Sequence, residues 1–479
     1  MTPLVSFAER RVIIMKERHS FGGSIGFVLA AAGSAVGLGN IWRFPYFAAK
    51  DGGGLFLLVY LILLFTFGFT LLITEVAIGR KTLQGPLTAY DKIKKGWKPL
   101  GVISCIVPVI IMPYYCVIGG WVLKYCFVFF GGEGTAAAED GYFGSYITST
   151  TQPLVLTVVF LAICATIVIL GVNKGIEASS KIIMPILIVL VLIISVFALT
   201  ITHTDAEGIT RTGMEGLKIY LIPNLEGLTF ASLLNVIVDA MGQLFFSLSV
   251  AMGIMVAYGS YVSKEANLQK SVMQIQLFDT AIAFLAGVMI IPAIYAFAGT
   301  EGMSAGPGLM FVSLPKIFAS MGSIGIIMGI LFFVMVLFAA VTSAVSVMEA
   351  VVSSLMDQFH MSRKKAAFIE GGIALIGGIF VCLGYNKMYF EVTLPTGTTG
   401  QLLDIMDYIS NNLLMPLGAI LTCILIGWVA KPKTIEDEIT LNGEKFGFHK
   451  MYVVMIKFVA PIMLTVLLLE SAGVLRLFM

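Results

Sequence analysis

Long apolar stretches separated by short polar segments run through the whole sequence. Eleven of them are long enough to cross the hydrocarbon core of a bilayer as helices, which takes about 20 residues each. The predicted spans centre on residues 24–49, 53–79, 99–130, 152–171, 178–202, 231–262, 272–298, 322–356, 366–384, 405–430 and 450–474. Because these runs are long and unbroken rather than short and alternating, they predict an all-α polytopic membrane protein and not a transmembrane barrel.

Two of the predicted spans are interrupted by residues that disfavour a helix. The first contains Gly33, Gly37 and Gly39, followed by Pro45, and the sixth carries small and polar residues over 242–253. Glycine weakens a helix and proline removes a backbone donor. An unpaired backbone group in hydrocarbon costs several kcal/mol, so a break persists only where something else satisfies it. A bound ion and a polar substrate would do so, and paired broken spans are typical of inverted-repeat secondary transporters.

Composition supports the membrane assignment. The 479 residues are 58% hydrophobic and only 12% charged, with a mean hydropathy of +0.96, whereas soluble domains carry about 25% charge. The net charge of +2 gives no indication of a nucleic-acid partner. All six cysteines fall inside apolar runs, which favours small buried hydrophobes over a disulfide framework or a metal site.

The placement of Lys and Arg predicts the orientation of the chain. Segments on one side carry many basic residues, within 10–18, 80–98, 174–181, 264–270, 363–365 and 431–450. The other side has only Lys50, Arg211, Lys218, Lys316, Lys387 and Arg476. Since cytoplasmic loops are enriched in these residues, we expect a multi-pass protein of the cell (inner) membrane with a cytoplasmic N-terminus. An odd number of spans then places the C-terminus on the extracytoplasmic side.

Several motifs resemble one known family. Residues 35–45 (AVGLGNIWRFP) resemble the first-span signature of the neurotransmitter:sodium symporters, and residues 242–249 (GQLFFSLS) resemble that of the sixth span. The resemblance continues through Tyr114-Tyr115 and through residues 339–343 (AAVTS). Eleven spans are typical of the bacterial branch, whose members carry amino acids. The resemblance implies a LeuT-like fold with a 5+5 inverted repeat and discontinuous helices one and six.

This fold implies a division of the chain into four parts. Residues 1–22 would form a cytoplasmic segment with an inner gate, 23–203 the first repeat (spans 1–5), 231–430 the second repeat (spans 6–10), and 450–479 span 11 with the C-terminus.

The family pattern implies two sodium sites built from oxygen ligands, which suit a small hard cation. The ligands of the first would be the carbonyl of Ala35 and the side chains of Asn40, Ser247 and Asp279, completed by the substrate carboxylate. Those of the second would be the carbonyls of Gly33, Val36 and Ala339 and the hydroxyls of Thr342 and Ser343. The alternative for the two hydroxyls is a bond back to their own helix.

Asp279 departs from the commonest family pattern. Many relatives have Asn at this place and Ser one turn later, where Ala283 stands here, and they need chloride. A carboxylate inside a span is expensive and indicates function. The hypothesis is that Asp279 supplies the negative charge that chloride supplies elsewhere, so chloride is not required, although Tyr60, Gln243 and Ser247 match the other chloride ligands. The alternative is a protonated Asp279 bonded to a neighbouring helix.

The resemblance places an amino-acid substrate between the two breaks. Helix ends with unpaired amides attract a carboxylate, Tyr115 would donate to it, and carbonyls near Ala35 and Phe246 would accept from the ammonium. The implied substrate-binding residues are Ser34, Ala35, Gly37, Gly39, Ile111, Tyr115, Ile118, Phe246, Ser247, Ser249, Met252, Ser343 and Val347. This set is mostly apolar and favours a neutral aliphatic or aromatic amino acid, although each apolar residue alone is typical of core packing.

Two charge pairs match gate positions. Arg43 with Asp407 would lie just outside the substrate, and Arg18 with Asp357 on the cytoplasmic side. The alternative for the second pair is ordinary interfacial charge. Near it, Phe21 stands where the family commonly has Trp, and Tyr261 is a further candidate for the inner gate.

Glu75 is a buried acid that we expect to anchor a broken helix.

The leading hypothesis is a sodium-coupled amino-acid symporter that works by alternating access, in contact with the lipid bilayer, with no nucleic-acid partner, as a monomer or homodimer. A membrane enzyme is disfavoured, since the four histidines fall in loops or at span ends and no His-Glu-x-x-His motif is present. An ion channel would need a continuous polar stripe along its spans rather than local breaks. A transporter of a related small zwitterion remains the other alternative.

Overall fold

The computed structural model describes residues 20–205, 207–299, 302 and 306–474. Within these residues, ten helices are long and apolar enough to cross a membrane, or eleven when one bent pair is counted as a single span. The spans are α2 (Ser24–Ala35) with α3 (Phe44–Lys50); α4 (Gly54–Leu63) with α5 (Phe69–Thr82); α7 (Lys98–Phe130); α9 (Thr151–Ile169); α10 (Ala178–Thr200); α12 (Phe230–Ser247) with α13 (Ile254–Gly259); α14 (Leu268–Ala298); α16 (Ser323–Phe359); α17 (Arg363–Gly384); α18 (Leu402–Asp407) with α19 (Met415–Ile424); and α21 (His449–Val454) with α22 (Ala460–Ser471). The eleven predicted spans are confirmed.

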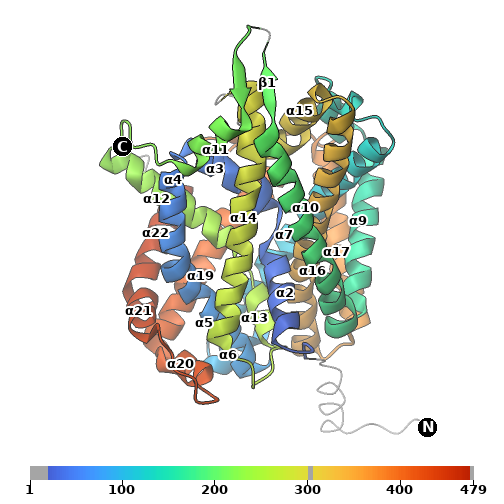
Figure 1. The fold of residues 1–479 in the computed structure, drawn as a ribbon. Helices are drawn as coiled ribbons and strands as arrows, with labels where there is room; N and C mark the ends of the chain where they lie inside the picture. Colours follow the sequence, from blue (N-terminus) through green and yellow to red (C-terminus); the bar gives the residue numbers. More distant parts are fainter. Residues whose placement is uncertain (1–19, 206, 300–301, 303–305, 475–479) are drawn as a thin grey trace, which may run out of the picture.

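The helices run side by side as one bundle (Figure 1). Large apolar side chains cover its outside, including Ile182, Ile376 and Ile462 at 60–65% exposure. Such a surface suits lipid rather than water, because lipid tails are as apolar as these side chains and exposing them to lipid costs no free energy. The long helices α7 and α16 pack on each other inside the bundle, and α16 also contacts α2.

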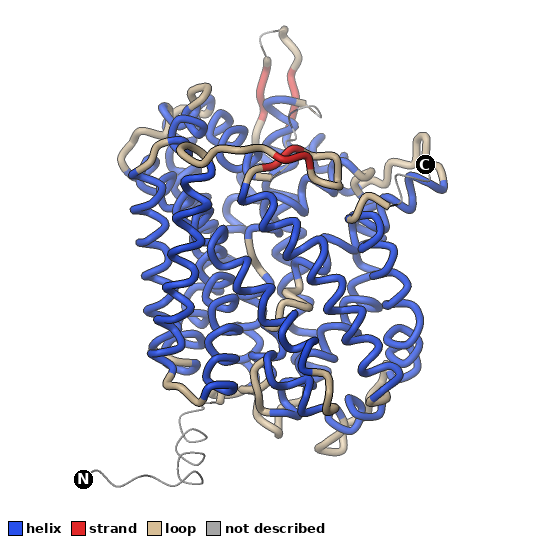
Figure 2. The backbone as a smooth tube through the Cα atoms, turned by 180° about the vertical axis from the view of Figure 1, so that it is seen from behind, coloured by secondary structure: helices blue, strands red, loops and turns tan. Residues whose placement is uncertain are grey.

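The two predicted interruptions are present. In the first span, α2 and the segment Gly39–Lys50 are bent by 55°. In the sixth, α12 ends at Ser247 and α13 begins at Ile254, so residues 248–253 are not helical. Figure 2 shows these breaks as loop segments in the middle of the bundle. The bundle thus holds non-helical backbone at its centre, where other helices surround it.

Short elements close the two ends of the bundle, and the hydropathy pattern does not predict them. They are α6 (Pro86–Ile93), α8 (Tyr142–Thr148), α11 (Gly213–Leu221), α15 (Leu314–Ser320), α20 (Lys433–Ile439), and the antiparallel hairpins β1 (Thr202–Thr204) with β2 (Thr210–Thr212) and β3 (Val392–Thr393) with β4 (Thr399–Gly400). The β1–β2 hairpin projects from one end, here named the hairpin end, and α20 lies at the other (Figure 1).

Candidate ion and substrate site

The break in the first span turns backbone carbonyls toward α16. After Ala35, the residues Val36 and Gly37 leave the helix. The Ser343 hydroxyl on α16 donates to the carbonyl oxygen of Ser34 at 3.0 Å and to that of Val36 at 3.4 Å. A helix would have used these oxygens for its own next turn. The break therefore presents carbonyls to a neighbouring span, which is the arrangement that broken transporter helices use to hold cations.

Two glycines at this break allow close approach. A Cβ atom on Gly37 would lie 2.8 Å from the Ser343 hydroxyl oxygen and 3.4 Å from that of Tyr115. A Cβ atom on Gly39 would lie 2.7 Å from ring carbons of Phe246. Any larger residue would push these side chains away. The absence of a side chain at these two glycines thus allows α7, α12 and α16 to pack closely against the first break.

The break in the sixth span is longer and has a different backbone. Ser249, Ala251 and Gly253 all have positive φ angles, of 52°, 61° and 73°. Glu75 on α5 accepts a hydrogen bond from the Ala251 amide at 2.7 Å. The prediction that Glu75 anchors a broken helix is therefore confirmed.

Side chains join the two breaks directly. The Ser249 hydroxyl donates to the Ser34 carbonyl at 3.2 Å, and the Ser34 hydroxyl donates to the Ser249 oxygen at 3.3 Å. The Gln243 amide donates to the Gly39 carbonyl at 3.2 Å. The two interruptions thus form one polar unit inside an apolar bundle.

The side chains predicted for the first sodium site lie together. Asn40 donates to the Asp279 carboxylate at 2.7 Å, and the Ser247 hydroxyl lies 2.9 Å from the same carboxylate oxygen. Asp279 is fully buried, and no Lys, Arg or His among the described residues forms an ion pair with it. A buried carboxylate without a cationic partner, next to amide and hydroxyl oxygens, has the donor chemistry for a hard cation.

The residues predicted for the second sodium site are also neighbours, with one difference between the two hydroxyls. Thr342 donates back to its own helix, to the carbonyls of Phe338 at 3.0 Å and Ala339 at 3.1 Å. Ser343 instead reaches the first break. A Cβ atom on Gly33 would lie 3.3 Å from the Thr342 Cβ. The alternative of a bond back to the helix thus describes Thr342 and not Ser343.

A small cavity of about 30 Å³ lies between the breaks. It is lined by Ser34, Ala35, Gly37, Asn40, Ile111, Tyr115, Phe246, Ser249, Met252, Ile254, Ser343 and Val347. Three predicted substrate residues, Gly39, Ile118 and Ser247, are buried nearby but are not part of this lining. Sequence reasoning missed Ile254, because the exact start of α13 decides that it faces the cavity.

The Tyr115 hydroxyl is the unusual group in this cavity. It is buried and has no hydrogen-bond partner among the residues that the structure describes. A buried polar group without a partner costs about 1–3 kcal/mol. A ligand that accepts a hydrogen bond here would remove that cost.

At the hairpin end, the structure does not bring the first predicted gate pair into direct contact. Within the described chain, Arg43 and Asp407 form no ion pair within 4.0 Å. The Arg43 guanidinium instead lies over the rings of Phe47 and Phe246, at 5.3 and 5.8 Å from their centroids. Asp407 accepts hydrogen bonds from the Tyr114 hydroxyl at 3.0 Å and the Asn411 amide at 2.6 Å.

At the opposite end, Arg18 lies outside the described residues. Its predicted partner Asp357 accepts a hydrogen bond from the Gly85 amide at 2.5 Å. Phe21 packs edge-on against Tyr258 and Tyr261, with ring centroids 5.7 and 6.3 Å apart. Phe21 thus fills this end with an aromatic ring, as the larger Trp would.

The structure shows an ion pair between α16 and α17 that was not predicted. Glu349 on α16 is fully buried and pairs with Arg363 on α17 through two hydrogen bonds, of 2.6 and 3.0 Å. The Tyr261 hydroxyl donates to Glu349 at 2.7 Å. A carboxylate inside the eighth span is itself a signal, and it could have pointed to Glu349.

Comparison with known proteins identifies the class of protein that this fold and site define. A model of the sodium:neurotransmitter symporter family matches residues 18–135 and 145–477. The chain belongs to this family and is a multi-pass, sodium-dependent membrane transporter with a LeuT-type fold.

Relatives and solved structures agree with this membership. The chain is 34% identical to the sodium-dependent transporter YhdH of Bacillus subtilis, over 95% of this chain and 98% of that protein. It is 28% identical to the sodium- and chloride-dependent taurine transporter of Rattus norvegicus, over 88% and 73%. The crystal structure of MhsT in complex with L-phenylalanine superposes with a TM-score of 0.81 at 35% identity, over 95% and 99%.

Proposed function

We propose that this transporter moves a neutral amino acid, aliphatic or aromatic, into the cell together with sodium by alternating access. The observation that carries the proposal is the unpartnered Tyr115 hydroxyl in the cavity between the two breaks. A substrate carboxylate would accept from it, and the carbonyls of the breaks would accept from the ammonium. The largely apolar lining suits an uncharged side chain. MhsT, a structural neighbour of this chain, was solved with L-phenylalanine.

Two sodium ions are proposed as co-transported substrates. One would lie at Asn40, Ser247 and Asp279, and the other between Gly33, Val36, Ala339, Thr342 and Ser343. Each sodium ion that enters down a potential of 100 mV contributes about 2.3 kcal/mol. If sodium completes the substrate site, each ligand raises the affinity of the other by the same factor.

We also propose that chloride is not needed. The Asp279 carboxylate would supply a fixed negative charge beside the sodium ion, next to Tyr60 and Gln243. The experiment that tests this replaces chloride with gluconate during uptake. Sodium-dependent transport in gluconate should run at the rate measured in chloride, and a strict need for chloride would contradict the role of Asp279.

The orientation belongs to the same proposal. The hairpin end would face outward and the α20 end the cytoplasm, because Lys and Arg are concentrated in segments near α20. The N-terminus would then be cytoplasmic and the C-terminus extracytoplasmic.

Uptake into proteoliposomes is the decisive test. A panel of labelled neutral amino acids, together with taurine, is offered with an inward sodium gradient and with potassium on both sides. We expect saturable, sodium-dependent uptake of one or more amino acids. Preferred uptake of taurine would favour the related-zwitterion alternative, and a substrate-independent sodium conductance would favour a channel.

A further inference from the structure

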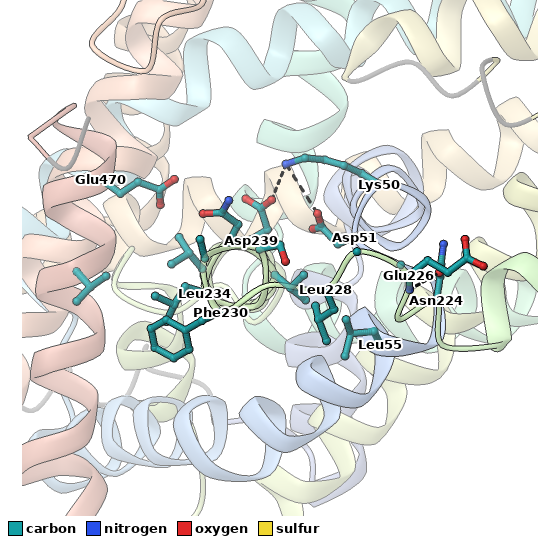
Figure 3. Close-up of a pocket in the computed structure, with 18 residues that line it drawn as sticks. Lys50, Asp51, Leu55, Asn224, Glu226, Leu228, Phe230, Leu234, Asp239 and Glu470 are labelled. Carbon is teal, nitrogen blue, oxygen red and sulfur yellow. Dashed lines mark hydrogen bonds and ion pairs between the residues drawn. The ribbon is translucent and has the colours of Figure 1, made fainter. Parts of the chain in front are cut away.

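A second, much larger hollow lies at the hairpin end, apart from the central cavity. Its volume is about 880 Å³. It is bounded by the end of α3, the segment that precedes α12, α12 itself, and Val466 with Glu470 on α22. Figure 3 shows Lys50, Asp51 and Asp239 meeting on one side of this outer pocket. None of its lining residues lines the central cavity.

The outer pocket carries an excess of negative charge. The carboxylates of Asp51, Glu226 and Asp239 line it, against the single amine of Lys50. The Lys50 amine lies 2.6 Å from the Asp239 carboxylate but 3.9 Å from that of Asp51. Lys50 therefore pairs with Asp239 and leaves Asp51 poorly compensated.

Asp51 is held in place and buried. Its side chain is 7% exposed, while that of Lys50 is 48% exposed. The loop behind it turns through Gly52 and Gly53, both with positive φ, and the Asn224 amide donates to the Gly52 carbonyl at 3.0 Å. One oxygen of Asp51, Oδ2, has no hydrogen-bond partner in the described part of the chain. A buried carboxylate oxygen without a partner attracts a donor that carries positive charge.

The rest of the pocket wall is apolar. Leu228, Phe230 and Leu234 are 40%, 78% and 44% exposed, and Leu55 and Val466 complete this side. Figure 3 shows the Phe230 ring and the leucines on the side of the pocket away from the Lys50 amine. A ligand for this surface needs an apolar body as well as a charged group.

Metal ions fit the pocket poorly. No group of three or more His, Cys, Asp or Glu within the described residues is arranged to hold a metal. A zwitterion would bring a carboxylate into a region that is already negative. We propose that the outer pocket is a binding site for a small organic cation, an ammonium or guanidinium group on an apolar body, with the charged group at Asp51 and Asp239 and the body against Phe230 and Leu234.

Occupancy of the outer pocket should depend on pH. Burial, and then the neighbouring charge of Asp239, raise the pKa of Asp51 to about 7. The charged groups that line the pocket with it are Lys50, Asp239, Glu226 and Glu470. Below pH 7, protonation removes the charge of Asp51, so the affinity for a cation should fall. Above pH 7 the carboxylate is charged and binding should reach its plateau.

The experiment measures binding of 2-phenylethylamine to the purified full-length protein by isothermal titration calorimetry, in potassium chloride without sodium. This amine lacks the carboxylate that the proposed central site requires. At pH 8 the wild type should bind it saturably, and at pH 6 the affinity should be at least 3-fold lower. The proposal would be overturned if no saturable binding appeared at pH 8, or if the affinity were the same at pH 6 and pH 8.

Four variants locate the site. Asp51→Asn should weaken binding at least 10-fold. Lys50→Gln removes the competing amine but also a charge that lowers the pKa of Asp51, so it is measured at pH 9, where Asp51 stays charged and binding should tighten. Phe230→Ala removes an exposed ring that packing does not need and should weaken binding of 2-phenylethylamine. Asp140→Asn, at a carboxylate that is 92% exposed and outside the pocket, should leave it unchanged.

The opposite directions for Asp51 and Lys50 separate binding from a loss of structure. Wild-type affinity in Asp51→Asn, or weaker binding in Lys50→Gln at pH 9, would refute the site. Loss of binding in Tyr115→Phe but not in Asp51→Asn would place the amine in the central cavity instead. The proposal does not depend on the proposed amino-acid transport, because the probe carries no carboxylate and the buffer no sodium.

Discussion

The two interrupted spans differ in what holds their backbone open. In the first, only Val36 and Gly37 leave the helix, and neither has a positive φ. Its freed carbonyls point to the Ser343 hydroxyl on α16. In the sixth, six residues are non-helical, three of them with positive φ. One amide of this second break is held by the Glu75 carboxylate.

The difference separates two tasks. The first break exposes oxygen atoms whose present partner is a rotatable hydroxyl, which can turn aside when a cation arrives. The second break is fixed by backbone geometry and by an acid from another span. Variants of the first should therefore change ligand binding most, and variants of the second should change folding stability.

The largest effect is expected at the ion cluster beside the first break, which Asn40 forms with Ser247 and Asp279. Asn40→Ala and Asp279→Ala each remove a polar side chain from the cluster with Ser247 and should abolish sodium-dependent amino-acid binding, by more than about 100-fold, with the protein still folded. A scintillation proximity assay with the amino acid found by uptake measures this. Thr280→Ala, next to Asp279 on α14, is the control and should bind normally. Unchanged affinity in both variants would remove the proposed ion site.

Tyr115→Phe should have the next largest effect. It removes the hydroxyl that lies beside Gly37 without changing the ring. Loss of a hydrogen bond to a charged group should weaken amino-acid binding by about 1–3 kcal/mol. The same binding assay measures the change, and the melting temperature should not fall, because this hydroxyl has no protein partner among the described residues. An unchanged affinity would show that the carboxylate binds elsewhere.

At the second break, Glu75→Ala should lower the free energy of unfolding by about 1–2 kcal/mol, because the Ala251 amide loses its acceptor. Thermal unfolding of the detergent-solubilised protein measures this. Glu75→Gln keeps an acceptor of the same shape and should retain most of the stability. Equal losses in the two variants would mean that the negative charge matters more than the hydrogen bond.

The smallest effect is expected for Ala251→Gly. A residue with a side chain in the left-handed conformation costs about 1–2 kcal/mol, and glycine removes this cost. Glycine also loses more conformational entropy on folding, which offsets part of the gain in stability. A net stabilisation of at most about 1 kcal/mol should appear in the same unfolding experiment. Val36→Gly, at a residue with φ of −73°, should instead destabilise. If both variants changed the free energy of unfolding in the same direction, the proposed difference in backbone strain between the two breaks would be wrong.

Sequence reasoning found the membrane spans and both interruptions, because span length and helix-breaking residues are local properties. It also found Glu75, since an acid in an apolar run must have a partner. It did not find the β1–β2 hairpin or α11, which depend on turn and capping interactions such as those of Thr212 with Glu215. The outer pocket was not predicted either, because the burial of Asp51 depends on residues 223–224, which are distant in sequence and pack on its loop.

Residues with two possible partners were the hardest to predict. Adjacent in sequence, Thr342 and Ser343 are similar in chemistry, yet one bonds to its own helix and the other crosses to the first break. The direction of each side chain follows from the rotation of α16 against α2. The same reason explains the pairing of Glu349 with Arg363, which lie on different helices.

The 55° bend makes α2, which precedes the break in the first span, a rigid arm that can rotate about the break. At 1.5 Å per residue, the twelve residues of α2 extend for about 18 Å from the break to Ser24. A rotation of about 10° at the break would displace the far end by about 3 Å. That distance is comparable to half the separation between the rings of Phe21 and Tyr258. A small rotation at the centre of the bundle would thus change the contact between the Phe21 ring and Tyr258.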